Sequence, residues 1–120
     1  MLTYDILLSD ALEKIPEFKN EYERLKSKEI LGDESGNHVI FGYAFTPILI
    51  DAIKGNDAKL RGEMLAYVES MSNSDDHLVV EVCDYSILEA LNDEFDDDFI
   101  KPLLGPSASE GYDAIKQYMN

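Results

Sequence analysis

The stretch GEMLAYVESMSNSDDHLVVEVCDYSILEALNDEFDDDFI, residues Gly62 to Ile100, combines two patterns around which the rest of the chain is organised. Its first part continues an amphipathic helix, which the spacing of the apolar positions indicates: Leu60, Met64, Tyr67, Val68 and Met71. Between Arg61 and Lys101 the chain has no lysine or arginine. The same interval carries twelve carboxylates: Glu63, Glu69, Asp75, Asp76, Glu81, Asp84, Glu89, Asp93, Glu94, Asp96, Asp97 and Asp98. The stretch therefore predicts helices that build the core and present an acidic face.

A second helix is expected after the turn Ser72-Asn73-Ser74. Ser74 is a candidate N-cap, and Asp75 and Asp76 then fall in the first turn, where the helix macrodipole favours anions. The apolar positions that follow are Leu78, Val79, Val82, Cys83, Ile87, Leu88 and Leu91. Because the segment from Asp84 to Ser86 interrupts this apolar pattern, we expect a kink there.

Two more helices are predicted upstream. Residues 4–14 form the first, with Thr3 as a plausible N-cap, and Pro16 breaks or restarts the chain. The second runs from Glu17 to about Ile30 and has a narrow apolar stripe and a mixed-charge surface. Residues 32–37 are rich in turn formers and predict a loop.

The segment HVIFGYAF, residues 38–45, is ambiguous because its β-branched and aromatic residues also suit a strand. We expect a buried helical turn or short helix here, since every long segment after it is helical and a lone strand would have no partner. Thr46-Pro47 is typical of a helix start, with a capping hydroxyl followed by proline at the first helical position. Gly55 ends that helix, and Asn56-Asp57 is expected to cap the next.

Two short helices complete the chain, at about 97–104 and 107–118, separated by Gly105-Pro106. A chain of 120 residues is large enough to bury one core without disulfides or metal ions. The sequence therefore predicts an all-α fold, a single domain over residues 1–120 built as a compact array of six to eight short helices.

The net charge of −15, from 25 acidic and 10 basic residues, bounds the class of partner. A field of this sign repels nucleic acid and anionic membranes and attracts cationic proteins. Solubility alone is an alternative explanation, but a magnitude of about 2 to 8 serves that purpose. The N-terminal residues Met1 to Asp5 lack a positive region before an apolar one, so we expect a cytoplasmic protein.

The inventory of reactive groups predicts no enzyme and no cofactor. Cys83 lies in an apolar run and is expected to be a buried structural thiol. His77 and Glu81, four residues apart, are too few to form a metal site, and no phosphate-binding glycine loop or nucleophile motif occurs. The composition therefore favours a binding module.

Four segments carry a resemblance to a known group of proteins: Asn37-His38-Val39-Ile40-Phe41-Gly42, Leu65-Ala66-Tyr67-Val68-Glu69, the run from Val82 to Leu91, and Leu103-Leu104-Gly105-Pro106. Residues 37–106 thereby resemble small, acidic, helical immunity proteins of bacterial polymorphic toxin systems, including those of contact-dependent growth inhibition. The resemblance implies an inhibitor that neutralises a toxin, with no catalytic residues. Toxin nucleases are typically basic because they bind phosphates, so an acidic inhibitor can cover that surface.

The predicted partner-binding site gathers the acidic helix ends with an aromatic anchor, Tyr85 or Phe95. Its members are Asp75, Asp76, Tyr85, Asp93, Glu94, Phe95, Asp96, Asp97 and Asp98. The expected partner is a basic protein, a cognate toxin nuclease domain, and not nucleic acid or a membrane. For a single aspartate the alternative is a helix cap or a solvated carboxylate, and for either aromatic residue it is core packing.

Two other functions fit the same charge. A nucleic-acid mimic would inhibit a DNA- or RNA-binding protein, but it needs regularly spaced carboxylates, whereas here they bunch near Asp75 and from Asp93 to Asp98. A non-catalytic adaptor domain would use the charge for solvation alone.

Overall fold

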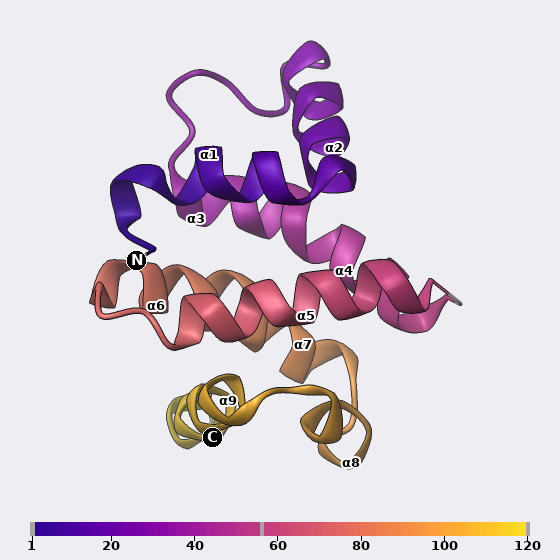
Figure 1. The fold of residues 1–120 in the computed structure, drawn as a ribbon, viewed down its shortest axis with the longest axis vertical. Helices are drawn as coiled ribbons and strands as arrows, with labels where there is room; N and C mark the ends of the chain where they lie inside the picture. Colours follow the sequence, from indigo (N-terminus) through magenta and orange to yellow (C-terminus); the bar gives the residue numbers. More distant parts are fainter. Residues whose placement is uncertain (1, 56, 120) are drawn as a thin grey trace.

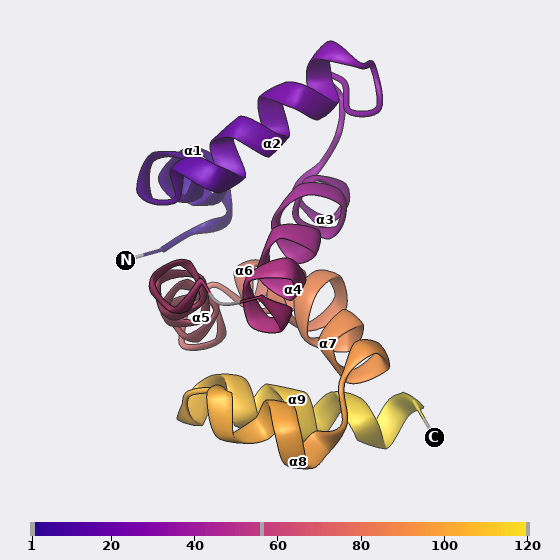
Figure 2. The same ribbon diagram turned by 90° about the vertical axis from the view of Figure 1, so that its right-hand side faces the viewer.

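The computed structural model describes residues 2–55 and 57–119, and within them twelve helical segments join into seven helices with no strand. The prediction of an all-α fold with six to eight helices is confirmed. The helices form three layers (Figures 1 and 2). Helices α1 (Tyr4–Lys14) and α2 (Pro16–Ser27) form one outer layer, and α8 (Asp97–Ile100) and α9 (Pro106–Met119) the other. Between them lie α4 (Thr46–Lys54), α5 (Ala58–Ser72), α6 (His77–Cys83) and α7 (Glu89–Glu94).

Two of the seven helices contain a π-helical turn. Helix α3 (Asn37–Ile40) continues through the π turn η1 (Phe41–Phe45) into α4, and α6 continues through η2 (Asp84–Leu88) into α7. The segment 38–45 is therefore helical as predicted, and the kink expected near Asp84 is the second π turn.

The spacing of buried residues explains both π turns. Phe41, Phe45, Leu49 and Ile53 are all buried and recur every four residues, as do Val79, Cys83, Ile87 and Leu91. Four residues advance about 40° beyond a full turn of an α-helix, so a long run of fours drifts off the buried face. A π turn has more residues per turn and removes that drift. Both halves of each helix can therefore face the same core.

The first core helix agrees with its predicted pattern. Leu60, Met64, Tyr67, Val68 and Met71 of α5 are at most 8% exposed. The carboxylate of Asp57 accepts a hydrogen bond of 3.1 Å from the Leu60 N–H and caps the helix as expected. Asn56, the other predicted capping residue, lies outside the described residues.

The predicted cap of the following helix is wrong. Helix α6 begins at His77, and its N-cap is Asp76, whose carboxylate accepts from the Leu78 N–H at 3.0 Å. Ser74 instead accepts from the Asp76 N–H and donates to the Leu2 carbonyl at 2.7 Å. Asp75 and Asp76 therefore precede the first turn and do not lie in it.

The hydroxyl of Thr46 also has a different role from the one predicted. Helix α4 begins at Thr46, but the chain enters it from η1 in helical conformation and the hydroxyl caps nothing. It donates to the Ser86 carbonyl at 2.6 Å, and Thr46 is only 3% exposed. The hydroxyl thus joins the two helices that contain π turns.

Candidate functional site

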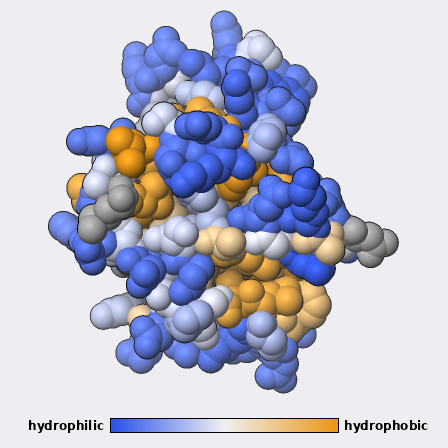
Figure 3. Space-filling model, in the orientation of Figure 1, coloured by the Kyte–Doolittle hydropathy of each residue, from blue (hydrophilic) through white to orange (hydrophobic). Residues whose placement is uncertain are grey.

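The acidic residues at the end of α7 and in α8 surround a surface depression. Its lining residues are Asn92, Phe95, Asp96, Asp97, Asp98, Phe99 and Lys116. Asp93 and Glu94 are exposed at the end of α7 just before it. On the face drawn in Figure 3, a hydrophobic patch lies over α7 and the connection from α8 to α9. The predicted cluster from Asp93 to Asp98 is therefore a single surface region, which we call the acidic corner.

The members of the acidic corner differ in what they bind. Asp96 and Asp98 are exposed and have no ion-pair partner among the described residues. Asp97 is engaged with α9, because it pairs with the Lys116 ammonium and accepts from the Tyr112 hydroxyl at 2.7 Å. Lys116 and then Tyr112 hold the pKa of Asp97 below its usual range. Asp97 therefore holds α8 against α9, and its neighbours are the carboxylates open to a partner.

The aromatic residues of the acidic corner form a pair. Phe95 is half-buried against the core, and its ring centroid lies 5.4 Å from that of Phe99. Lys54 reaches this region from α4: its ammonium lies 3.2 Å from Glu94 and 5.9 Å from the centre of the Phe95 ring. Phe99 is 51% exposed, so it and not Phe95 is the accessible aromatic residue. Phe99 was not predicted, because nothing in the local sequence distinguishes it from Phe95.

Asp75 and Asp76 lie at the other end of the same helix. The helix from His77 to Glu94 has 18 residues and is about 27 Å long. Asp76 caps this helix and also accepts from the Tyr4 N–H at 2.8 Å, which lowers its pKa. Asp75 is exposed. The nine predicted residues are thus spread along one helix and its two ends instead of converging on one point.

Tyr85 stands in the middle of that helix, in η2, and is 59% exposed. Glu81 precedes it by four residues and is exposed, and Glu89 follows it by four and is half-buried. The exposed side of the helix therefore carries an aromatic residue between carboxylates. A second tyrosine, Tyr43 of the contacting turn η1, is also 59% exposed and was not predicted.

The remaining acid of η2, Asp84, faces the interior. Its Oδ1 atom is buried without a hydrogen-bond partner among the described residues. A Cβ atom added to Gly111 of α9 would lie 3.0 Å from this oxygen, so α9 approaches it closely. Burial, with the charge of Glu81, raises the pKa of Asp84 to about 6. Cys83 beside it is fully buried, and burial raises its pKa to about 12, as expected for a structural thiol.

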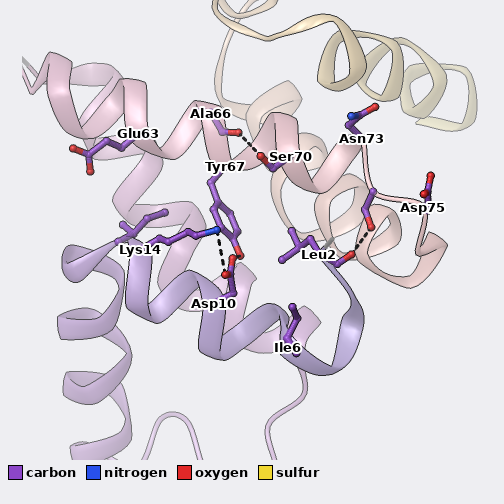
Figure 4. Close-up of a pocket in the computed structure, with 12 residues that line it drawn as sticks. Leu2, Ile6, Asp10, Lys14, Glu63, Ala66, Tyr67, Ser70, Asn73 and Asp75 are labelled. Carbon is purple, nitrogen blue, oxygen red and sulfur yellow. Dashed lines mark hydrogen bonds and ion pairs between the residues drawn. The ribbon is translucent and has the colours of Figure 1, made fainter.

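A groove of about 980 Å³ runs between α1 and α5 (Figure 4). Tyr67 points from α5 toward α1, where its hydroxyl donates to Asp10 at 2.8 Å. Lys14 pairs with the same carboxylate at 3.2 Å. Ser70 and Glu63 lie along the α5 side. The polar groups in the middle of this groove bind one another and join the two helices.

Residues 8–120 match a family described as a domain of unknown function, DUF7674. The chain belongs to this family. The match includes both π turns, the acidic corner and α9, and the family's description assigns no activity to them. None of the curated proteins and none of the solved structures matches this DUF7674 domain.

Two further observations apply to residues 2–55 and 57–119 of the DUF7674 domain. No three or more histidine, cysteine or carboxylate side chains there converge into a group that could hold a metal ion. No helix in this part is both long and apolar enough to cross a bilayer. What the arrangement offers chemically is a set of exposed carboxylates beside exposed aromatic rings.

Proposed function

We propose that this protein is a non-catalytic inhibitor that captures a basic protein. We further propose that the partner is the nuclease domain of a cognate toxin, which the protein neutralises as an immunity protein. One observation carries the proposal: the helix from His77 to Glu94 and the following α8 present exposed carboxylates and exposed aromatic rings. No lysine or arginine occurs in the chain from Gly62 to Ile100.

Such a surface suits a basic partner for two physical reasons. Opposite charges accelerate the encounter and orient the two surfaces, most strongly at low salt. Aromatic residues supply binding energy once water is displaced, as they do at the centres of many interfaces. A nuclease needs a basic surface to bind phosphates, so covering that surface blocks substrate without any chemistry. Nuclease and immunity pairs are among the tightest protein complexes known.

The test uses the protein encoded by the gene immediately upstream, with its C-terminal domain purified as the probe. Isothermal titration calorimetry at several salt concentrations measures the affinity of the unmodified protein for this domain. We expect tight binding that weakens as salt rises, and loss of the domain's nuclease activity in the complex. Absence of binding at low salt would contradict the proposed function.

Reversing the charge of exposed aspartates tests whether the acidic corner is the surface that binds the partner. Asp93, Asp96 and Asp98 are exposed, so the triple variant D93K/D96K/D98K should fold and bind at least tenfold more weakly. Asp97 is left unchanged because it holds α8 to α9. A matched control reverses Glu17, which is exposed on α2, together with Asp5 and Glu23, and so changes the net charge equally.

If the control variant weakens binding as much as D93K/D96K/D98K, total charge and not the acidic corner governs the interaction. Competition by duplex DNA of any sequence for the partner would instead support a nucleic-acid mimic.

A further inference from the structure

The two π turns contact each other, and hydrogen bonds tie η2 to the residues on either side of η1. The Thr46 hydroxyl donates to the Ser86 carbonyl at 2.6 Å, and the Ser86 hydroxyl donates to the His38 carbonyl at 3.0 Å. The hydroxyl oxygen of Ser86 also lies 3.3 Å from Nδ1 of the His38 ring. His38 lies in α3 before η1 and Thr46 begins α4 after it, so these bonds hold η2 against the helix that contains η1. We call this contact the π seam.

One side of the π seam is core and the other is solvent. Phe41, Phe45 and Ile87, which belong to the two turns, are 0% exposed. Tyr43 and Tyr85 belong to the same two turns and are each 59% exposed. Tyr85 directly precedes Ser86, and Tyr43 lies between His38 and Thr46, the two residues that bind Ser86. Each helix of the seam therefore exposes one tyrosine to solvent from its π turn.

Rigid support makes these rings suitable anchors. A tyrosine side chain has few rotatable bonds, and it is carried here by a hydrogen-bonded helical backbone. Fixing the ring on binding therefore costs little conformational entropy. π turns within α-helices often occur at functional sites. Val39, 45% exposed and one turn before Tyr43, extends the apolar surface along the same helix.

The two chain segments that form the π seam favour a cationic ligand by their sequence. Neither residues 37–53 nor residues 62–100 contain a lysine or arginine, and Glu81 and Glu89 lie four residues before and after Tyr85. A guanidinium group stacks on an aromatic face through cation–π attraction and forms hydrogen-bonded pairs with carboxylates. A tyrosine ring with a carboxylate on either side along the helix offers both interactions to one arginine. A lysine ammonium would use them less completely.

We propose that the π seam is the anchor point of the interface, where Tyr43 and Tyr85 receive arginine side chains of the basic partner. This inference rests on the proposed function and gives it a specific contact. Tyr85 and Asp93 are eight residues apart on one helix, about 12 Å. A partner covering about 800 Å² can reach both the π seam and the acidic corner. The acidic corner then guides association, and the π seam holds the complex.

The experiment measures the affinity of single variants for the same upstream-encoded domain at 150 mM salt, about the physiological ionic strength. Y43A and Y85A should each bind about 10- to 100-fold more weakly through faster dissociation, because anchor truncations cost this much at other interfaces. Y43F and Y85F keep the aromatic face and should bind within about threefold of the unmodified protein. Y118A is the matched control, since Tyr118 is 87% exposed and far along α9, and it should leave affinity unchanged.

A second variant tests the same surface without removing a ring. V39R places a cation on the seam and should weaken binding by repelling the partner's arginines, and its unfolding midpoint shows whether the fold is kept. The π seam is not the anchor if Y43A, Y85A and V39R all bind within twofold of the unmodified protein while D93K/D96K/D98K still binds more weakly. That result would leave the proposed function standing. Failure of the unmodified protein to bind would overturn both.

Discussion

The contact between Glu69 and the start of α9 predicts that Gly105→Ala destabilises the unmodified protein but stabilises a variant that lacks the Glu69 side chain. Glu69, on α5, accepts hydrogen bonds of 2.9 Å from the N–H groups of Ser107 and Ala108, in the first turn of α9. Its carboxylate thus caps a helix that begins 37 residues after it. A Cβ atom at Gly105 would lie 2.5 Å from Oε1 of Glu69. An alanine at position 105 therefore forces the carboxylate out of its bonded position.

The magnitudes follow from the two hydrogen bonds. Removing a capping side chain costs about 0.5–2 kcal/mol, and hydrogen bonds to charged groups contribute about 1.5–3 kcal/mol. We expect Glu69→Ala to lower the free energy of unfolding by about 2 kcal/mol. Gly105→Ala breaks the same bonds, but it also stabilises by about 0.4–1 kcal/mol because alanine restricts the unfolded chain. Its net cost in the unmodified protein is then about 1 kcal/mol.

In the Glu69→Ala background the capping bonds are already lost, so Gly105→Ala has nothing left to break. It should then stabilise the protein by about 0.5 kcal/mol, because no described glycine requires a left-handed backbone. Urea unfolding followed by circular dichroism, for the unmodified protein and the three variants, completes a double-mutant cycle. A cost for Gly105→Ala that is equal in both backgrounds would refute the reasoning.

The same contact has a dependence on pH. Burial opposes ionisation of Glu69, but the hydrogen bonds from Ala108 and Ser107 outweigh it, so its pKa lies below the usual value. A carboxylate with a lowered pKa contributes stability above its unfolded-state pKa of about 4.3, and that contribution is lost as pH falls through the folded-state pKa. The difference between the unmodified protein and Glu69→Gln should therefore shrink below about pH 4.

Two further predictions concern carboxylates and their partners. Because the pKa of Asp84 is raised to about 6, the stability it contributes is complete below about pH 4 and lost as pH rises through 6. Asp84→Asn should therefore raise the free energy of unfolding by about 1 kcal/mol at pH 7.5, a value that allows for partial exposure. At pH 4 the same substitution should change the free energy of unfolding by almost nothing. An equal effect at both pH values would show that charge is not the cause. Tyr112→Phe should lower the free energy of unfolding by about 1 kcal/mol, because it removes the 2.7 Å hydrogen bond from the tyrosine hydroxyl to Asp97. The control Tyr118→Phe, on an 87% exposed side chain, should change the free energy of unfolding by less than about 0.5 kcal/mol in the same thermal or urea measurement.

The core could be predicted because burial follows local spacing. The five predicted core positions of α5 recur at helical intervals and are all buried. In α6, Val79, Val82 and Cys83 are buried as predicted, but Leu78 is 42% exposed. Even the π turns had a sequence signal, in buried residues spaced by four at 41, 45, 49 and 53. The sequence suggested only a kink near Asp84, since a run of fours is short and also fits a bent α-helix.

The functional surface could be predicted only in part, because exposure and pairing depend on distant segments. Asp97 and Asp98 are adjacent in sequence, yet Asp97 is bound by α9 and Asp98 is exposed. Phe95 was expected as an anchor but packs on the core, while Phe99, which was not predicted as a site residue, is 51% exposed. Residue type alone does not tell which aspartate or which phenylalanine of such a pair is exposed.

The sequence alone determined that the chain is helical and acidic, because helix formation and charge follow from neighbouring residues. The tertiary structure decided which groups are free to bind. The Glu69 carboxylate accepts from the Ser107 N–H, 38 residues away, and the Asp76 carboxylate from the Tyr4 N–H, 72 residues away. Tyr43 and Tyr85 belong to two π turns that contact each other only because their helices pack together. The unpaired groups at the end of a helix are satisfied by whatever packs against them, and no local pattern in the sequence specifies that neighbour.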